Sequence, residues 1–284
     1  MRSLLLGDDP RASHEASYEP LLSLTPERQR STFRQNCLAV GALFAGAYVD
    51  AVMQSWIDRL HDRHRDLLPD MGIDALSSFA HLSHDLPDVL LVSVTILSLV
   101  RVLLHRRRVT LLRRYAVLQG LILFLRSMTI SVTRLPGPRG PSCRNVMPAD
   151  LNPLLGGVLV LTRQILTCGD VMFSGHTSAM VLWALITNSA DRRAGDHLPS
   201  RLKSPIRIAI WALVWCGAFV IIATRFHYTV DVIVAVMLTC SMVWLYTALV
   251  QIGVYRTKVE IDDDRLEAGG FGRVVALVSW LERE

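Results

Sequence analysis

The stretch Cys168-Gly169-Asp170-Val171-Met172-Phe173-Ser174-Gly175-His176-Thr177-Ser178 is polar and leads directly into a long apolar run. A second polar stretch, His227-Tyr228-Thr229-Val230-Asp231, stands at the start of a later apolar run. Each stretch places a histidine where a membrane-spanning helix would begin. Ionisable side chains at a membrane boundary are costly and point to function. The two stretches therefore predict one site at one face of a membrane, with the remaining chain as its scaffold.

The composition is that of an integral membrane protein. Of the 284 residues, 51% are hydrophobic, and the mean hydropathy is +0.35. Six apolar segments each approach the roughly 20 residues needed to cross the hydrocarbon core of a bilayer. The expected fold class is all-α, a polytopic domain with six transmembrane helices over residues 36–254, between tails at 1–35 and 255–284. The predicted spans are Asn36–Ile57, Leu86–Leu104, Tyr115–Thr133, Phe173–Ala190, Ile206–Thr224 and Val230–Val254.

The distribution of arginine predicts how these spans are oriented. Lys and Arg in short connectors near span ends are retained in the cytosol. The connectors after the second and fourth spans are basic, as is the segment before the first span, whereas the first connector is rich in aspartate. Both termini are therefore expected in the cytosol, and His176 and His227 at the lumenal or exterior face. No apolar h-region follows Met1, so no cleavable signal peptide is predicted.

The charge and the cysteines exclude several other classes of site. The net charge of +5 does not indicate nucleic-acid binding, because the basic residues lie in short connectors rather than on a face with stacking aromatics. The spacing of cysteines and carboxylates predicts neither a zinc nor a magnesium site, so no metal or other cofactor is expected. Cys143 and Cys168 share one predicted non-cytosolic connector, where a disulfide is chemically allowed. The sequence leaves open whether it forms.

The pair of His227 and Asp231 has the spacing of about one helical turn. The carboxylate can therefore reach an imidazole nitrogen, fix the tautomer and leave the other nitrogen free to attack or to take a proton. His176 would act on the same substrate as a second acid or base. A plainer interpretation stays open, because histidines at helix ends are often interfacial residues and Asp is a favoured N-cap.

The residues just before His176 suit an anionic substrate. Ser174 and Gly175 lie where a helix begins, and the unpaired amides of a helix N-terminus attract phosphate oxygens. The stretch therefore predicts phosphoryl transfer through a transiently phosphorylated histidine, with Ser174 and Gly175 binding substrate. Arg126, inside the third span, is expected to contact a lipid phosphate, to pair with Asp50, or to reach the interface. Arg225 is a minor candidate for a phosphate contact.

Two further segments leave alternatives open. The C-terminal stretch Phe271–Glu284 mixes apolar and charged residues, and is either an amphipathic helix on the cytosolic leaflet or a partly ordered tail. Small residues in the first span favour close helix contacts, either within one chain or between copies, so the oligomeric state is open. These residues are Gly41, Ala42, Ala45 and Gly46.

The two polar stretches resemble the signature motifs of the sphingomyelin synthases and related sphingolipid synthases, including the inositol phosphorylceramide synthases, within the wider lipid phosphate phosphatase superfamily. Three weaker features are similar to the same family, and the resemblance covers about residues 36–254. These features are Leu86-Pro87-Asp88, Arg126 followed by Thr133 and Leu135-Pro136-Gly137-Pro138, and Gly156-Gly157.

The resemblance implies a lipid phosphate phosphatase-like core that transfers a phospho-headgroup from a glycerophospholipid to ceramide and releases diacylglycerol. Carried over by position, His227 attacks the donor phosphate with support from Asp231. His176 handles the proton on the leaving oxygen or on the ceramide hydroxyl, and Asp170 orients or tunes His176. A Golgi or plasma-membrane location is expected. The departure from the family after the second stretch and the presence of Arg225 leave choline, ethanolamine and inositol open as headgroups.

The sequence leaves two alternative functions open. A lipid phosphate phosphatase or phospholipase C-like hydrolase would use the same histidines but give the second step to water. It is disfavoured because that family's Lys-rich first motif has no clear counterpart before His176. A non-catalytic scaffold or transporter is disfavoured because the sequence contains no paired inverted repeats.

Overall fold

The computed structural model describes residues 26–60, 66–133, 135–139, 147–148, 150–165, 167, 171–191, 198–259 and 270–282. Within these ranges the chain forms helices and no β-strand, which confirms the all-α fold class. The α-helices are α1 (Pro26–Arg59), α2 (Met71–Ala75), α3 (Leu86–Leu103), α4 (Arg108–Val132), α5 (Pro153–Leu161), α6 (Gly175–Asp191), α7 (Ser200–Ala223), α8 (Thr229–Val259) and α10 (Gly270–Glu282), with a 3₁₀ turn at Ser77–Phe79.

Five of these helices, α1, α3, α4, α7 and α8, are long and apolar enough to cross a membrane. They correspond to five of the six predicted spans. The remaining predicted span is α6, which has 17 residues and so stands at the short end of the range for a spanning helix. Its buried residues include Met180, Leu182 and Trp183. The described chain is therefore a multi-pass membrane protein with α6 as an inner helix.

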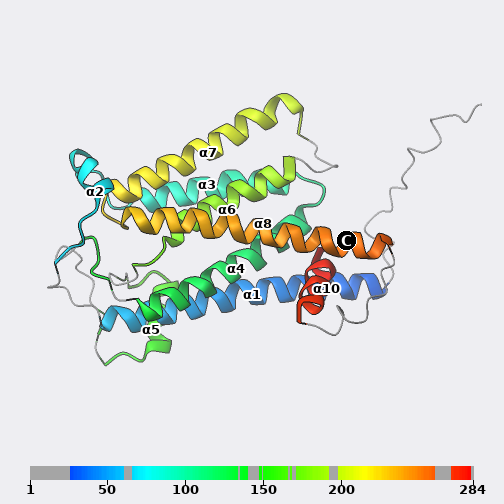
Figure 1. Ribbon diagram of the computed structural model, residues 1–284, viewed down its shortest axis with the longest axis horizontal. Coiled ribbons are helices and arrows are strands. Elements are labelled where there is room, and N and C mark those ends of the chain that lie inside the picture. Colours follow the sequence, from blue (N-terminus) through cyan, green and yellow to red (C-terminus); the bar gives the residue numbers. More distant parts are fainter. Residues whose placement is uncertain are drawn as a thin grey trace, which may run out of the picture.

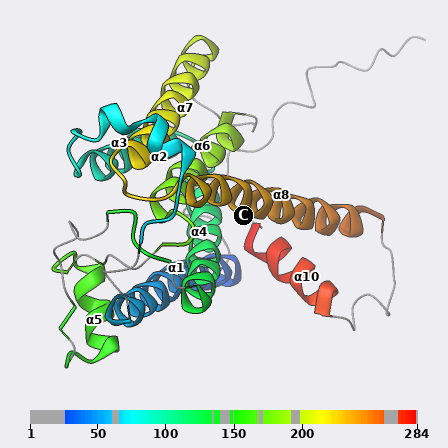
Figure 2. The same cartoon turned by 60° about the vertical axis from the view of Figure 1, so that its left-hand side comes forward.

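Helix α6 is the centre of the arrangement, because it packs against α3, α4, α7 and α8. Figure 1 shows α7 and α3 along one side of the bundle and α1 and α5 along the other, with α4, α6 and α8 between them. In the turned view of Figure 2, α1, α4 and α5 group on one side of α8, and α3, α6 and α7 group on the other. The starts of α6 and α8 meet at the end of the bundle that carries α2 and α5.

Helices α1 and α4 approach each other closely at a pair of glycines. A Cβ on Gly46 would lie 2.2 Å from the carbonyl oxygen of Gly120, and a Cβ on Gly120 would lie 2.4 Å from that of Ala42. Only glycine allows two backbones to come this near. Gly46 and Ala42 therefore pack within the chain, whereas a Cβ on Gly41 would meet no other atom within 4 Å.

The C-terminal stretch forms helix α10, which packs on α8 and α4 at the end of the bundle away from α2 and α5. Glu282 forms an ion pair with Arg114 of α4 at 2.7 Å, and the Gln35 amide donates to the carbonyl oxygen of Trp280 at 2.7 Å. Gln35 also accepts a hydrogen bond from Arg113. The stretch is thus a helix held by the bundle, with Phe271, Val274 and Leu277 on its exposed face.

Candidate active site

The first polar stretch enters α6 through a well-anchored N-terminus. Val171 and Phe173 are buried. The Ser174 hydroxyl oxygen accepts from the Thr177 amide at 3.2 Å and from the Thr177 hydroxyl at 3.0 Å. Ser174 is therefore the N-cap of α6 and is fully buried. The Ser174 hydroxyl oxygen is thus engaged by Thr177 within the helix. The predicted contact of Ser174 with substrate stays a prediction.

The second polar stretch is joined to the first by the main chain. The Ser174 amide donates to the carbonyl oxygen of Asp231 at 3.2 Å. Asp231 lies in the first turn of α8, and its carboxylate accepts from the amide of Tyr228, the residue before the helix, at 3.1 Å. The same oxygen, Oδ2, lies 3.5 Å from Nδ1 of His227, which is too far for a hydrogen bond. Asp231 is therefore not the N-cap itself, but it binds the N-cap amide and faces His227.

His176 has a carboxylate partner of its own. Its Nε2 lies 2.8 Å from Oδ1 of Asp88, in the first turn of α3. Asp88 was not predicted as a site residue, because it is far from His176 in the sequence. The signal that pointed to it is the Leu86-Pro87-Asp88 stretch, where Pro87 fits the first turn of a helix. The structure therefore contains two histidine–carboxylate pairs, one for each polar stretch.

Phe226 brings the two imidazoles to one place. Its ring contacts His176 with a centroid separation of 4.9 Å and His227 with one of 5.6 Å. The Arg139 guanidinium lies over the same ring, 4.3 Å from its centre, in cation–π geometry. The segment that includes Leu135 and Arg139 therefore lies against the site.

The site is more open at His176 than at His227. The side chains of His227 and Asp231 are 4% and 0% exposed, whereas those of His176 and Asp88 are 18% and 29% exposed. A substrate approaching from solvent therefore meets the pair of His176 and Asp88 first. Arg163, just beyond the end of α5, also pairs with Asp88 Oδ1 at 2.7 Å and is 58% exposed.

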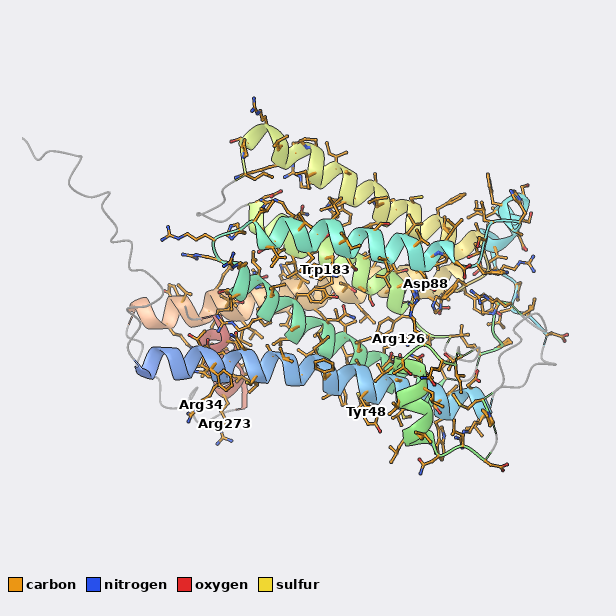
Figure 3. All side chains as sticks on the ribbon, turned by 180° about the vertical axis from the view of Figure 1, so that it is seen from behind. Arg34, Tyr48, Asp88, Arg126, Trp183 and Arg273 are labelled. Atoms are coloured by element: carbon orange, nitrogen blue, oxygen red, sulfur yellow. The ribbon has the colours of Figure 1, made fainter. Side chains whose placement is uncertain are left out.

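Arg126 pairs with Asp50, one of the three outcomes expected for it. Its Nη1 lies 2.9 Å from Asp50 Oδ2, and both side chains are buried. Its Nε donates to the carbonyl oxygen of Phe173 at 2.9 Å. A Cβ on Gly175 would lie 3.5 Å from the same Nε. Arg126 thus supports the backbone that leads into α6, and Figure 3 shows it at the same end of the bundle as Asp88, away from Arg34 and Arg273.

The first connector holds the start of α8. Asp70 caps α2 through the amides of Gly72 and Ile73. It also accepts from the Thr229 amide at 2.7 Å and from the Thr229 hydroxyl at 2.6 Å. Partial burial alone would raise the pKa of Asp70, but these hydrogen bonds outweigh it and hold the pKa below its ordinary value of 3.8. The connector is therefore bound next to His227.

Tyr228 completes this contact between the connector and the second stretch. Its hydroxyl oxygen accepts from the Leu68 amide at 3.2 Å, and its ring packs with Ile73 and Val171. Burial raises the pKa of Tyr228, and the negative charges of Asp231 and Asp70 add to the effect. The phenol therefore stays protonated at neutral pH and serves as a packing residue.

Several predictions cannot be compared with the structure. Asp170, Cys143 and Cys168 lie outside the described residues, so the role of Asp170 and the disulfide stay predictions. Arg225 is half-buried just beyond the end of α7, with a positive φ of 54°. Among the described residues, no group of three or more His, Cys, Asp or Glu is arranged to hold a metal ion.

Comparison with known proteins finds a family match that includes part of this site. Residues 167–248 match the family described as PAP2 superfamily C-terminal. The matched segment contains His176, His227 and Asp231, whereas Asp88 and Arg126 lie on the chain before it. The carboxylate of Asp88 therefore reaches the site from outside the matched segment.

The chain is also similar to proteins named as sphingomyelin synthase-related or as ceramide cholinephosphotransferases, which confirms the resemblance. It is 28% identical over 211 residues to sphingomyelin synthase-related protein 1 of Mus musculus, covering 69% of this chain and 42% of that protein. The Homo sapiens protein of the same name is 27% identical over 212 residues, covering 69% and 48%. The Homo sapiens phosphatidylcholine:ceramide cholinephosphotransferase 1 is 31% identical over 157 residues, covering 52% and 36%. The matches thus span less than half the length of these relatives.

Proposed function

We propose that this chain transfers a phospho-headgroup from a glycerophospholipid to ceramide and releases diacylglycerol. The observation that carries the proposal is that each of two histidines at one end of the bundle has its own carboxylate, Asp88 for His176 and Asp231 for His227. One imidazole can then act as a nucleophile while the other moves a proton. The similarity to named cholinephosphotransferases supports phosphate as the group transferred.

In the first step, Nε2 of His227 attacks the phosphorus of the donor lipid. The bond between phosphorus and the diacylglycerol oxygen breaks, and protonated His176 gives its proton to that oxygen. Asp231 faces Nδ1 of His227 and stabilises the positive charge that develops on the ring. The 3.5 Å separation of this pair is expected to shorten when substrate binds, as in other sites without substrate.

In the second step, His176 takes the proton from the primary hydroxyl of ceramide. The hydroxyl oxygen attacks the phosphorus, the bond to Nε2 of His227 breaks, and the phospho-headgroup leaves on ceramide. Asp88 holds Nε2 of His176 at 2.8 Å and so leaves Nδ1 of that ring for proton transfer. The first step uses the proton of His176 and the second step restores it, so the two steps together consume no proton.

The positions of the other predicted residues suggest supporting roles. Ser174 caps α6, and Arg126 fixes the Phe173 carbonyl next to it. Arg126 is therefore proposed to position the first stretch rather than to bind phosphate. Gly175 lies where the helix begins and allows a phosphate oxygen to approach the backbone.

The orientation in the membrane belongs to the same proposal. The basic connectors support a site at the lumenal or exterior face, with both termini in the cytosol. A Golgi or plasma-membrane location would give the site access to ceramide and glycerophospholipid in that leaflet. Cysteine accessibility to a membrane-impermeant reagent, with a single cysteine introduced at Asp74 or at Arg201, tests the orientation directly.

A hydrolase with the same histidines is the second candidate. The exposure of His176 and Asp88 to solvent favours it, because His176 could take a proton from water in place of the ceramide hydroxyl. The deciding experiment offers purified protein labelled ceramide with phosphatidylcholine, phosphatidylethanolamine or phosphatidylinositol separately. A labelled phosphosphingolipid from one donor supports the transferase and names the headgroup, whereas free phosphorylated headgroup with unchanged ceramide identifies the hydrolase.

Matched variants connect that assay to the site. His176→Ala and His227→Ala are expected to abolish transfer while the protein still inserts and accumulates. His81→Ala is the control, because His81 is exposed and lies in the turn between the 3₁₀ segment and α3. Retained transfer in either of the first two variants would contradict the mechanism.

A further inference from the structure

Two helices that end near the site terminate in the same way. After α5, the Gln164 amide donates to the carbonyl oxygen of Leu159 at 2.9 Å and the Arg163 amide donates to that of Val160 at 3.0 Å. This pair of bonds is the Schellman motif, in which the residue after the cap takes the left-handed conformation. Arg163 holds that position with a φ of 56°.

Helix α7 ends with the same pair of bonds. The Phe226 amide donates to the carbonyl oxygen of Ile221 at 2.9 Å, and the Arg225 amide donates to that of Ile222 at 3.0 Å. Arg225 has a φ of 54°. Glycine is the usual residue at this position, because a Cβ there is strained. Both helix ends therefore have an arginine with positive φ at the position that glycine usually occupies.

Strained positions of this kind persist where the side chain makes an interaction that glycine cannot make. A cation near a helix C-terminus is favourable, but Lys or Arg in the last helical turn gives that benefit without strain. The helix dipole alone therefore does not account for Arg163. Its side chain points instead to the site, since the guanidinium lies 2.7 Å from the Asp88 oxygen that also holds His176.

The exposure of Arg163 separates it from the other cations of the site. Arg126 is buried and engaged by Asp50 and by the Phe173 carbonyl. Arg163 is 58% exposed, and its partner Asp88 is 29% exposed. An ion pair open to solvent is weak and exchanges partners readily. Arg163 can therefore leave Asp88 for a phosphate oxygen, to which arginine binds through two parallel hydrogen bonds.

We propose that Arg163 binds the phosphate of the donor lipid at the entrance to the site, exchanging Asp88 for the phosphate. The inference rests on the proposed function for the identity of the lipid. When Arg163 moves to the phosphate, the Asp88 carboxylate is left to His176 alone. The opposite charge then favours the imidazolium that donates a proton to the leaving oxygen. Binding of the donor phosphate and formation of the His176 imidazolium are thereby coupled through the Asp88 carboxylate.

The test uses the full chain in detergent and a glycine substitution that separates strain from binding. In Arg163→Gly the helix end receives its usual residue, so the unfolding temperature without lipid should be unchanged or higher. Stabilisation by a short-chain phosphatidylcholine, relative to the diacylglycerol of the same chain length, should be lost. Arg163→Lys should keep part of that stabilisation. Arg201→Ala is the matched control, because Arg201 is exposed at the opposite end of α7.

The KM for the donor lipid provides a second test. The KM for the donor lipid in Arg163→Gly should rise about 10- to 100-fold, the effect of losing a hydrogen bond between charged groups, and Arg163→Lys should recover part of it. A wild-type KM and wild-type lipid stabilisation in Arg163→Gly would overturn the inference. A large drop in unfolding temperature would also overturn it, because Arg163 would then be a structural tie between α5 and α3.

The binding assay distinguishes this inference from the proposed function. If wild-type protein makes no phosphosphingolipid but Arg163→Gly loses the phosphate-specific stabilisation, the transferase fails and the phosphate site stands. If wild-type protein transfers the headgroup and Arg163→Gly matches it in KM and in stabilisation, the transferase stands and the role of Arg163 fails.

Discussion

The main-chain amide of Ser174 donates a hydrogen bond to the main-chain carbonyl oxygen of Asp231 across 3.2 Å. The bond ties the start of α6 to the start of α8, backbone to backbone, so substituting a side chain does not remove the atoms that form it. Point variants of His176 and His227 therefore leave this frame in place. Their effects on activity can be interpreted as loss of an imidazole rather than loss of the site.

The two roles of Asp231 can be separated by substitution. The side-chain oxygen of asparagine can accept the same bond, so Asp231→Asn should keep the hydrogen bond from Tyr228 and fold normally. It removes the charge that stabilises His227, and kcat should fall about 10²- to 10⁴-fold. Asp231→Ala should lose the hydrogen bond as well, at about 1 kcal/mol of stability. Equal kcat in wild type and Asp231→Asn would contradict a role for the carboxylate.

Asp88 is predicted to position His176 rather than to touch substrate. Asp88→Asn should lower kcat about 10²-fold or more, because it removes a charge that supports proton transfer. Asp88→Glu keeps the charge and should recover part of the rate. An unchanged kcat in Asp88→Asn would show that the pair is not used.

The ion pair of Arg126 and Asp50 is predicted to be structural. Both side chains are buried, so Arg126→Met leaves a buried carboxylate without its cation and should cost about 3–5 kcal/mol. Adding Asp50→Asn should restore much of that loss, because the remaining charge is removed. Thermal unfolding of the two single variants and the double variant measures this. Equal stability of Arg126→Met and wild type would contradict the assignment.

The lowered pKa of Asp70 predicts that the stability of the fold depends on pH in the acidic range. Its pKa is lower in the folded state than the ordinary value of 3.8. The stabilisation it gives is therefore fully present well above 3.8 and is lost as the pH falls through the folded-state pKa. The difference in unfolding temperature between wild type and Asp70→Asn should shrink over that acidic range. The same difference in unfolding temperature should also be smaller in a Thr229→Val background, which lacks the hydroxyl that donates to Asp70 at 2.6 Å.

Much of the fold follows from the sequence for a simple physical reason. A segment that crosses lipid must be apolar and helical over nearly its whole length. Long apolar stretches of sequence therefore identify α1, α3, α4, α7 and α8. Helix α6 is also rich in apolar residues, but it has 17 residues and packs against four other helices. Packing around it, which the sequence does not display, decides its place at the centre.

The site was predictable only where its residues are neighbours in the chain. His227 and Asp231 are one turn apart, so their pairing follows from helical geometry. His176 and Asp88 are 88 positions apart and meet because α3 packs on α6. Arg163 reaches the same carboxylate from the end of α5. No periodicity within one helix encodes such contacts, which is why Asp88 and Arg163 were missing from the predicted site.

The contact between Asp70 and Thr229 has a consequence for how the protein is made. Asp70 follows the first membrane helix, and Thr229 begins the last one of the described bundle. A ribosome that has released only the chain through α7 has produced Asp70 but neither His227 nor its carboxylate. The site can therefore be completed only after the final helix is inserted with its start on the same side as the first connector. Incomplete or inverted chains are therefore expected to lack a complete site and to be inactive.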